Sequence, residues 1–551
     1  MKRRDFIKNT GALASAPLLL NGVSVKSMNH IINTGHDITD RVLVVIQLFG
    51  GNDGLNTFIP INQYDEYKNN RPDIAIENTG INKYIDLDSS LSLEAQVGLH
   101  PIMTGLKDMY DDGLVNIIHG VSYPSQSRSH FHSTDIWMSG DDGNADILKR
   151  SGIAGRYLQS VFPDVKGVPS SQMQDPPGIQ LGSNKPSLYF HTGEAYSSAI
   201  NLSSQTPNGL FETASQFAGN YPSFDNTTDY GKGMEYLVGM LDSTNQYSQV
   251  ISNRYDNGSN STAVTYPTSS LANQLKTVAR LISGGSKTKL YLLRADGSYD
   301  THGTQAETGA THTGRHADLL YKLTSSIKAF MDDIKNLGVD DRVMGTIFSE
   351  FGRQVPQNAS YGTDHGSLNH IFVFGKPVKA GVTGQNVNIS DLVSKAPNPN
   401  QMQTDYRQLY ATLYQDWLGA SSDILNSVDI QSFEDQKLDI IDDAYKVNQE
   451  DLLDNITNAD DSITIETTSI KPNPARDLVA ITIDSSLTSS GGTISVLDLN
   501  GLKVHEEKIE FNGGAANVFT IDVSQIPQGQ YIVHTQIQSY TSSKKILISR
   551  A

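Results

Sequence analysis

The sequence predicts an α/β protein with a mostly parallel, doubly wound sheet, followed by a small β-sandwich. Three observations support this prediction. Between residues 40 and 432, short apolar runs alternate with segments of helical periodicity. Several of these runs end at glycine-rich or acidic turns. After residue 470, apolar and polar residues alternate between Asn-Gly and Gly-Gly pairs, which is typical of short strands joined by tight turns.

The apolar runs of the first region are rich in β-branched residues, as expected for strands buried on both faces of a sheet. We expect strands at residues 42–46, 115–121, 289–293, 343–348 and 370–375. We expect helices at residues 101–112, 133–138, 315–336 and 406–418. Residues 201–270, rich in Asn, Ser, Gly and Tyr, show neither pattern, so they are interpreted as an irregular insertion or lid over the sheet.

Composition limits the class of protein. The chain has 551 residues and a formal net charge of −18, and its lysines and arginines form no basic stripe. Nucleic-acid binding requires clustered positive charge, so no nucleic-acid partner is expected. The absence of cysteine excludes disulfides, thiolate metal sites and cysteine nucleophiles. No apolar run after residue 25 is long enough to span a bilayer, so no internal membrane anchor is expected.

Part of the negative charge is concentrated between the two predicted domains. Residues 434–461 contain ten acidic residues and only two lysines. We interpret residues 433–469 as a solvated acidic linker, with an acidic binding segment as the alternative.

The N-terminus has the features of an export signal. Arg3 and Arg4 precede Asp-Phe-Ile-Lys, and a moderately apolar stretch follows from Gly11 to Leu20. A charged segment followed by a short apolar one is typical of a signal peptide. The paired arginines resemble a twin-arginine signal, which implies that residues 1–25 are recognised by the twin-arginine translocase. A basic amphipathic helix is the alternative.

The C-terminal region carries a second export feature. It begins with Lys-Pro-Asn-Pro-Ala at residues 471–475, contains Asp-Leu-Asn-Gly at 498–501, and ends with Lys544-Lys545 before an apolar run. In this order the motifs resemble the type A sorting domain of the type IX secretion system of Bacteroidota, over residues 470–551. The resemblance implies a secreted or cell-surface protein that passes through the periplasm and contacts the type IX machinery. A carbohydrate-binding or immunoglobulin-like module is the alternative.

Polar clusters follow the predicted strands of the first region. They are Asp53, the triplet Asp300-Thr301-His302, Glu350, and the pair Asp364-His365. Open α/β sheets bind ligands at the carboxyl ends of their strands, where these clusters would converge. Carboxylates and imidazoles gathered there suit zinc, manganese or magnesium. Asp300 and His302 are two residues apart, so they point to the same side of an extended segment.

Each of these residues has a simpler explanation when it is taken alone. An aspartate after a strand is more often the N-cap of the next helix, and a lone histidine is usually a structural hydrogen-bonding residue. Their joint occurrence in this order favours a metal site.

A fifth polar cluster lies between a predicted strand and a predicted helix. Residues 125–132 read Ser-Gln-Ser-Arg-Ser-His-Phe-His. The amino end of the helix would hold an anion beside a serine nucleophile, Ser129 or Ser127, with Arg128 as the counter-charge. An ordinary serine-rich helix cap is the alternative.

Five motifs in order resemble the bacterial family catalogued as domain of unknown function 1501, over about residues 40–432. The motifs start at Gly50 (Gly-Gly-Asn-Asp-Gly-Leu-Asn), Arg128 (Arg-Ser-His-Phe), Tyr299 (Tyr-Asp-Thr-His-Gly), Ser349 (Ser-Glu-Phe-Gly-Arg) and Gly362 (Gly-Thr-Asp-His-Gly). The family is grouped with alkaline phosphatases and sulfatases, which bind two metals and attack phosphate or sulfate esters. The resemblance therefore implies an alkaline-phosphatase-like fold.

The resemblance also implies roles for individual residues. Asp53 is similar to a metal-bridging aspartate, and Ser129 is similar to the nucleophile. Asp300, His302 and His365 are similar to the ligands of the first metal. Glu350 stands with Phe351 where the superfamily often has Asp-His, so the second metal would lose an imidazole, and a site with one metal or without zinc is an alternative.

Two functions remain open from the sequence. The first is a secreted metal-dependent hydrolase or transferase that acts on phosphate or sulfate esters, with a small or polymeric substrate. Zinc is the first choice of divalent metal, and manganese, magnesium and calcium are alternatives. The chain has no sequence that could mature to formylglycine, which argues against a standard sulfatase. The second is a non-catalytic envelope binding or assembly protein on a phosphatase-like fold.

Overall fold

The computed structural model describes residues 40–144, 151–163, 165–170, 173–183, 185–194, 196–203, 206–216, 224–392, 401–447, 465–485, 491–498, 503–510, 516–537 and 540–550. The chain divides into two compact units, residues 1–449 and 450–551. Each unit has its own hydrophobic core. The predicted signal at residues 1–25 lies outside the described residues, and so do residues 448–464 of the predicted linker.

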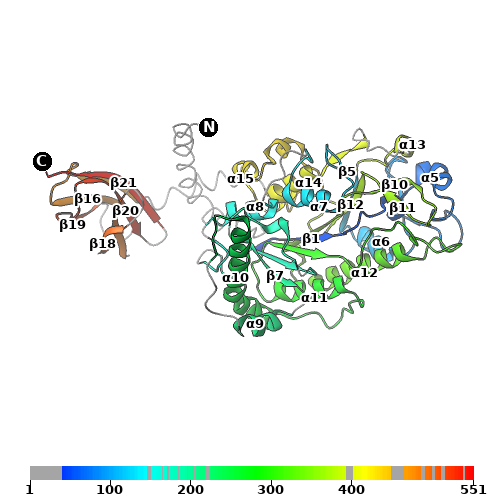
Figure 1. Ribbon diagram of the computed structural model, residues 1–551, viewed down its shortest axis with the longest axis horizontal. Helices are drawn as coiled ribbons and strands as arrows, with labels where there is room; N and C mark the ends of the chain where they lie inside the picture. The colour runs from blue at the N-terminus through cyan, green and yellow to red at the C-terminus, as the bar shows by residue number, and fades with distance from the viewer. Residues whose placement is uncertain are drawn as a thin grey trace. The chain divides into compact units, whose positions relative to one another are not determined.

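A nine-stranded sheet forms the centre of the first unit (Figure 1). Its order is β13-β5-β12-β9-β1-β8-β6-β7, with β14 paired to β5 beside this path. The strands are β1 Val42–Gln47, β5 Val115–Ser122, β6 Gly178–Leu181, β7 Ala199–Ser203, β8 Leu290–Arg294, β9 Val343–Phe348, β12 Asn369–Phe374, β13 Gly381–Thr383 and β14 Thr404–Asp405. All pairings are parallel except those of β12, which runs antiparallel to β5 and β9. The predicted mostly parallel sheet is confirmed.

Helices cover both faces of this sheet. In Figure 1, α7, α8, α14 and α15 lie on one side of it, and α6, α11 and α12 lie on the other. The α-helices are α4 Gly54–Thr57, α5 Tyr64–Asn70, α6 Thr104–Asp111, α7 His130–Ser139, α8 Ile153–Val161, α9 Pro207–Gln216, α10 Asp229–Asn257, α11 Ser270–Ser283, α12 Arg315–Asn336, α13 Ile389–Leu392, α14 Tyr406–Thr412 and α15 Ser422–Ser427. The architecture is therefore the doubly wound one that the sequence predicts.

Shorter elements complete the first unit. Two small sheets have the orders β2-β4-β3 and β10-β11. Their strands are β2 Phe58–Pro60, β3 Ile85–Asp86, β4 Val97–Leu99, β10 Arg353–Gln357 and β11 Thr363–His365. The 3-10 helices are η3 Ile61–Gln63, η4 Leu188–Phe190, η5 Asp340–Arg342 and η8 Gln431–Gln436, and η7 Leu413–Trp417 is a π-helical continuation of α14. None of the described helices has the length and apolar character needed to cross a bilayer.

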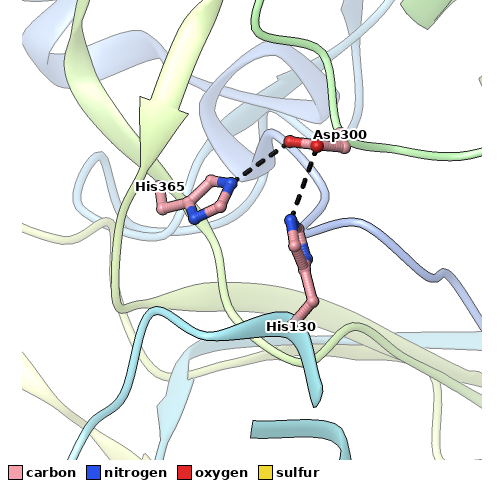
Figure 2. A group of neighbouring side chains, drawn as sticks. All are labelled: His130, Asp300 and His365. Atoms are coloured by element: carbon pink, nitrogen blue, oxygen red, sulfur yellow. Dashed lines mark hydrogen bonds and ion pairs between the residues drawn. The ribbon is translucent and has the colours of Figure 1, made fainter. Parts of the chain in front are cut away.

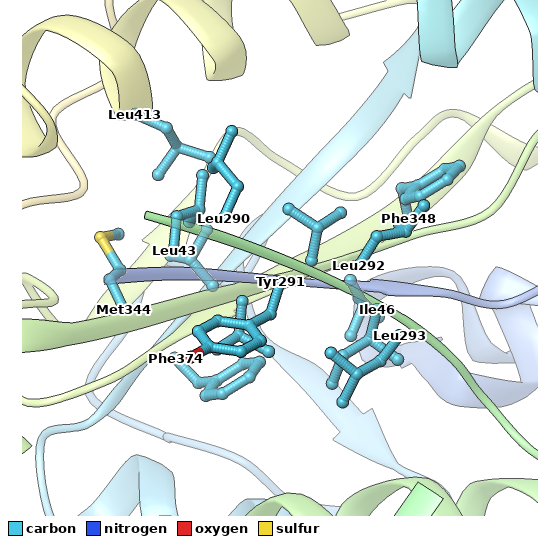
Figure 3. Close-up of a cluster of buried hydrophobic side chains, with 14 of the residues drawn as sticks. Leu43, Ile46, Leu290, Tyr291, Leu292, Leu293, Met344, Phe348, Phe374 and Leu413 are labelled. Carbon is cyan, nitrogen blue, oxygen red and sulfur yellow. The ribbon is translucent and has the colours of Figure 1, made fainter. Parts of the chain in front are cut away.

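The core explains why the central strands read as continuous apolar runs. Residues 42–46 of β1 are at most 1% exposed, and β1 lies between β8 and β9. Figure 3 shows Leu43 and Ile46 among side chains from both neighbours, including Leu290 and Met344. A strand that is covered on both faces has no solvent side, so polar residues do not alternate along it.

Residues 201–270 are more regular than predicted. They contain α9 and the 29-residue helix α10. The hydroxyl of Thr228 accepts a hydrogen bond from the Gly231 amide and so caps the start of α10. The buried face of α10 mixes small polar and larger side chains: Ser243, Ser248 and Ser252 lie on it together with Tyr247 and Ile251. Because half of its buried residues are serines, the apolar stripe of this helix is weak in the sequence.

The first unit continues past residue 432 into the predicted acidic linker. Ile440 and Ile441 are fully buried, and Ile441 forms an antiparallel bridge with Val378. Asp439 forms ion pairs with Lys379 and with Lys446. Residues 433–447 therefore pack against the α/β unit, and part of their negative charge is paired with lysine.

The second unit consists of two antiparallel sheets. One has the order β15-β16-β19 and the other β18-β17-β20-β21. The strands are β15 Ile465–Lys471, β16 Leu478–Ser485, β17 Gly491–Leu497, β18 Lys503–Glu510, β19 Ala516–Asp522, β20 Gly529–Ile537 and β21 Tyr540–Ile548. Alternate apolar residues of both sheets form one core, as shown by Val479 and Ile481 of β16 with Ile494 and Val496 of β17. The predicted β-sandwich is confirmed.

One position in the central sheet gives a direct test of this packing. A Cβ added to Gly345 in β9 would lie 2.1 Å from Cζ of the buried Phe374 ring on β12. We expect Gly345→Ala to lower the free energy of unfolding by about 1–3 kcal/mol, because the ring has no space into which to move. Chemical denaturation measures this change.

Gly233→Ala in α10 is the matched control, because nothing lies within 4 Å of the added Cβ and alanine favours helix. Equal changes in the free energy of unfolding for the two substitutions would show that the Phe374 ring does not fill the space at Gly345.

Candidate functional site

Three side chains meet in the arrangement of a metal site. His130 begins α7, Asp300 follows β8, and His365 ends β11. Figure 2 shows that the two imidazoles point toward the carboxylate. One ligand atom from each residue lies within 4.8 Å of the others, and no other described residues form such a group.

The Asp300 carboxylate is the centre of this group. It accepts a hydrogen bond of 2.5 Å from the guanidinium of Arg353. The Nε2 atoms of His365 and His302 each lie 3.2 Å from Oδ1, and Nε2 of His130 lies 3.5 Å from Oδ2. Burial works to raise the pKa of Asp300, but the bond from Arg353 outweighs it and lowers the pKa to about 2. The carboxylate is therefore ionised under all ordinary conditions.

The other nitrogen of each imidazole is held by an oxygen acceptor. Nδ1 of His130 lies 2.7 Å from Oε1 of Glu350, and Nδ1 of His365 lies 2.9 Å from the carbonyl oxygen of Arg128. Oε1 of Glu350 also accepts a hydrogen bond from the Gly50 amide, and a carbonyl oxygen can only accept. Nδ1 must therefore be the donor, which leaves the lone pair of a neutral imidazole on Nε2. This is the tautomer that binds a metal through Nε2.

A third imidazole repeats the pattern at the edge of the group. Nδ1 of His302 lies 3.0 Å from Oδ1 of Asp364, and its Nε2 lies 2.8 Å from Nε2 of His365. If both imidazoles donate through Nδ1, two lone pairs face each other across 2.8 Å. Only a cation or a proton between them removes this repulsion. Nitrogen lone pairs that face each other beside a carboxylate are a donor set that fits a divalent cation.

Arg353 holds the loops that carry this group. Its side chain is fully buried and donates to the carbonyl oxygens of Gly51, Thr363 and Tyr299 at 2.7, 2.9 and 3.2 Å. It also donates to the carbonyl oxygen of Gly50. One guanidinium therefore joins the loops after β1 and β8 to strand β11.

Gly50 permits the close approach of the first of these loops. Its φ is 122°, and a Cβ at this position would lie 2.3 Å from the backbone nitrogen of Asp300. Its own amide donates to Glu350 at 2.8 Å. Only glycine combines this backbone conformation with this contact. The glycine-rich turn after β1 therefore serves to place Asp300 and Glu350.

Five of the predicted metal-site residues lie in or against this group. Asp300 and His365 are members of it, and His302 lies beside them. Glu350 and Asp364 instead bind the Nδ1 atoms of two imidazoles. The sequence therefore locates the site, while the division between residues that face the centre and residues that orient them comes from the structure.

Asp53 lies apart from the group, in a buried ion pair. Its Oδ2 accepts hydrogen bonds of 2.6 Å from Arg71 and 2.5 Å from Gln305. It occupies the N-cap position of α4, but its side chain makes no capping bond. Both Asp53 and Arg71 are at most 1% exposed. This pairing could not be predicted from the sequence, because Arg71 is the C-cap residue of a separate helix, α5.

The predicted nucleophile lies at the start of α7. Ser129 is the N-cap residue and is exposed, but its hydroxyl makes no capping bond. Its backbone amide donates to the hydroxyl of Ser127 at 3.2 Å. Ser129 therefore offers a hydroxyl beside His130, whereas Ser127 is engaged within the loop.

Arg128 lines a pocket next to the group. The same pocket is lined by Gly54, Arg353 and Ser367. The Nε atom of Arg128 is buried without a hydrogen-bond partner among the described residues, while its carbonyl oxygen binds His365. The pocket therefore presents a positive side chain whose hydrogen-bonding capacity is not filled.

His130 is the member of the group that sequence analysis missed as a ligand. It stands inside the Arg-Ser-His-Phe motif, in which the serine is the predicted nucleophile. Its position in the first turn of a helix that follows a strand could have indicated His130 as a ligand, because open α/β sheets bind ligands there.

Glu350→Gln tests the orientation of His130. The Glu350 carboxylate raises the pKa of His130, against the opposing effect of burial. We expect the substitution to lower the pKa of His130, because the amide no longer stabilises the imidazolium. NMR titration of histidine-labelled, metal-free protein measures the pKa.

Glu307→Gln, at an exposed position, should leave the pKa of His130 where it was. An unchanged pKa in Glu350→Gln would contradict the assigned bond.

The Asp53–Arg71 pair predicts a pH-dependent stability. Burial works to raise the pKa of Asp53, but Arg71 outweighs it, and the pKa lies below its usual value. The pair therefore contributes fully above the unfolded-state pKa of about 3.9, and this contribution is lost as the pH falls through the lower folded-state pKa. At pH 7, Asp53→Asn should lower the free energy of unfolding by about 3–5 kcal/mol, because Arg71 stays buried without its partner.

Denaturation of both proteins at pH 7 and pH 3 measures the difference between them. We expect this difference to narrow at the lower pH. An equal difference at both pH values would show that Asp53 is not ionised in the folded protein.

The comparison with solved structures finds only distant similarity. A protein of the alkaline phosphatase superfamily from Vibrio parahaemolyticus is 9% identical, with coverage of 93% of this chain and 83% of that one and a TM-score of 0.32. A Bacteroides thetaiotaomicron structure that concerns the metabolism of multiple glycosaminoglycans is 8% identical, with coverage of 92% and 89% and a TM-score of 0.28. An endo-beta-1,4-mannanase from Thermotoga petrophila is 18% identical, but the match covers only 19% of this chain and 23% of that one, with a TM-score of 0.12.

Two families match parts of the chain, whereas no curated protein matches it. Residues 263–425 match the family described as "Protein of unknown function (DUF1501)", and this range includes Asp300 and His365. Residues 469–549 match the family described as "Secretion system C-terminal sorting domain". The second match indicates a secreted or cell-surface protein that is exported by type IX secretion. The chain thus combines a region similar to a family of unknown function, which carries most of the site, with a C-terminal sorting domain.

Proposed function

We propose that this secreted protein is a metal-dependent enzyme that hydrolyses phosphate or sulfate esters or transfers their anionic group. The observation that carries the proposal is the convergence of imidazole Nε2 atoms on the Asp300 carboxylate, with each Nδ1 held by an oxygen acceptor. This arrangement leaves ligand lone pairs facing one point. The five sequence motifs support the same reading.

The proposed ligands are Nε2 of His130, Nε2 of His365 and the carboxylate of Asp300. His302 supplies a further nitrogen beside His365. Nitrogen-rich sites with one carboxylate suit zinc, at ligand distances of about 2.0–2.2 Å, and also manganese. Magnesium and calcium prefer oxygen ligands, so they fit this set less well. The bound ion would act as a Lewis acid on an ester oxygen.

The start of α7 supplies the other parts of the proposed reaction. Arg128 and the amino end of the helix would bind the anionic oxygens of the ester. Oγ of Ser129 would bond to phosphorus or sulfur while the bond to the alcohol oxygen breaks, and the serine proton would leave with the alcohol. Water would then release phosphate or sulfate and restore the serine, whereas a second alcohol in place of water would make the enzyme a transferase.

A second candidate function is favoured by one contact. Arg353 already neutralises the Asp300 carboxylate, so the site has a compensating positive charge even without a cation. In this second function the protein would be a non-catalytic envelope binding or assembly protein. It would bind its ligand at the metal-free site, with Asp300 paired to Arg353.

Metal analysis of the full-length protein, together with assays on aryl phosphates and aryl sulfates, distinguishes the two functions. We expect the wild type to retain zinc or manganese after dialysis and to hydrolyse at least one of the two ester classes. Asp300→Asn and His365→Ala should lose the metal and lower kcat/KM by about 100-fold or more, because each removes a direct ligand.

His505→Ala removes an imidazole from the second unit and should change neither the metal content nor kcat/KM. A folded wild type that takes up neither metal would rule out the enzyme and leave the binding protein.

Ser129→Ala separates the nucleophile from the metal site. The variant should keep its metal and lose ester hydrolysis, because the hydroxyl is not among the proposed ligands. Undiminished hydrolysis would exclude Ser129 as the nucleophile.

A further inference from the structure

We propose that Gln305 is a positioning residue for the metal centre, because it joins the two loops that carry Asp300 and His365 and anchors both on Asp53. This inference rests on the proposed function, since it concerns the spacing of metal ligands. Neither the sequence motifs nor the group of three points to Gln305. Its role follows from a buried chain of hydrogen bonds beneath the site.

The carbonyl end of the Gln305 side chain joins the two loops. Its Oε1 accepts hydrogen bonds from the hydroxyls of Thr301 at 3.0 Å and Thr363 at 2.8 Å. Thr301 stands between Asp300 and His302, and Thr363 precedes Asp364 and His365. All three residues of this junction are at most 1% exposed. The backbone amide of Thr363 also donates to the carbonyl oxygen of Thr301 at 3.1 Å.

The amide end of Gln305 is anchored on the buried ion pair. Its Nε2 donates to Oδ2 of Asp53 at 2.5 Å, and Arg71 donates to the same oxygen at 2.6 Å. Arg71 also donates to the backbone carbonyls of Gln354 and Val355 at 2.9 and 2.7 Å. These residues follow Arg353 in β10, so the same anchor supports the guanidinium that binds Asp300.

Only a glutamine satisfies both ends of this junction. The carbonyl oxygen takes two threonine hydroxyls, and the NH2 group gives a proton to a carboxylate. Glutamate would place a second negative charge against Asp53, and methionine would fill the volume without making either bond. Without an acceptor, the two buried hydroxyls lose their partners, and the loops that carry the ligands lose their fixed separation.

In this network Asp53 acts through Gln305. Its Oδ2 already accepts two hydrogen bonds, and its charge is balanced by Arg71. Asp53, which the family resemblance suggests as a metal-bridging residue, is placed by this proposal as the anchor of Gln305. We refer to Asp53, Arg71, Thr301, Gln305 and Thr363 as the Gln305 network.

Metal binding by the full-length protein tests the inference without relying on activity. Zinc affinity is measured by competition with a chelator, and the visible spectrum of the cobalt-substituted protein reports the ligand geometry. We expect Gln305→Met to weaken zinc binding by about 10–100-fold, the range found for residues that orient metal ligands. Thr301→Val and Thr363→Val should each weaken it by about 10-fold and alter the cobalt spectrum.

Thr324→Val is the matched control. Thr324 is a buried threonine in α12 whose hydroxyl donates to a backbone carbonyl. The substitution therefore removes a buried hydroxyl that makes no contact with the site. The zinc affinity of this variant should stay within about twofold of that of the wild type, and its cobalt spectrum should keep the same shape. We expect this even if the variant loses as much stability as the other variants do. The double variant Thr301→Val with Gln305→Met should bind zinc no more weakly than Gln305→Met alone, because both substitutions remove a hydrogen bond to the same atom, Oε1 of Gln305.

The inference is overturned if Gln305→Met, Thr301→Val and Thr363→Val all bind zinc as the control does. If Gln305→Met does not fold, the two threonine variants decide the question in the same way. A wild type that binds neither zinc nor cobalt would overturn the proposed function itself, and so the two failures are distinct.

Discussion

A single buried guanidinium, that of Arg353, is the interaction on which the carboxyl edge of the sheet depends. It donates to backbone carbonyls after β1, after β8 and in β11, and to the carboxylate of Asp300. A buried charge is costly unless its hydrogen bonds are filled, so these loops are stable only when they close around it. Closure places Asp300 at the centre of the site and keeps it ionised. The contact with Arg353 therefore fixes the position of the Asp300 carboxylate and also lowers its pKa.

The imidazoles extend this organisation outward. Each presents Nε2 to Asp300 because an oxygen acceptor holds its Nδ1. Glu350 and Asp364 are such acceptors, and Gln305 fixes the loops behind them. The residues that face the centre, those that orient them and those that space the loops thus form successive layers around Asp300. Such layering is what a metal centre requires, because a ligand displaced by about 1 Å no longer binds well.

The parts of the fold that the sequence predicted are those with a strong periodic signal. Strand β1 reads as an apolar run because both its faces are covered, and α12 has the bounds Arg315–Asn336 that its pattern predicted. Helix α10 was not predicted because half of its buried residues are serines, which weakens the apolar periodicity of its sequence. In the site, Asp300 and His365 were predicted from their place after strands. The separation of Asp53 could not be predicted, because it depends on Arg71, and the contribution of His130 depends on the path of the loop before α7.

The most direct test of a cation centred on Asp300 is X-ray diffraction from crystals grown with zinc, with an anomalous difference map calculated from data collected at the zinc edge. We expect a peak within coordination distance of Nε2 of His130, Nε2 of His365 and the carboxylate of Asp300. We also expect Asp53 still to accept its hydrogen bonds from Arg71 and Gln305. A map without a peak at Asp300, or a peak bound by Asp53 in place of its contact with Arg71, would show that Asp300 is not the centre of a cation site.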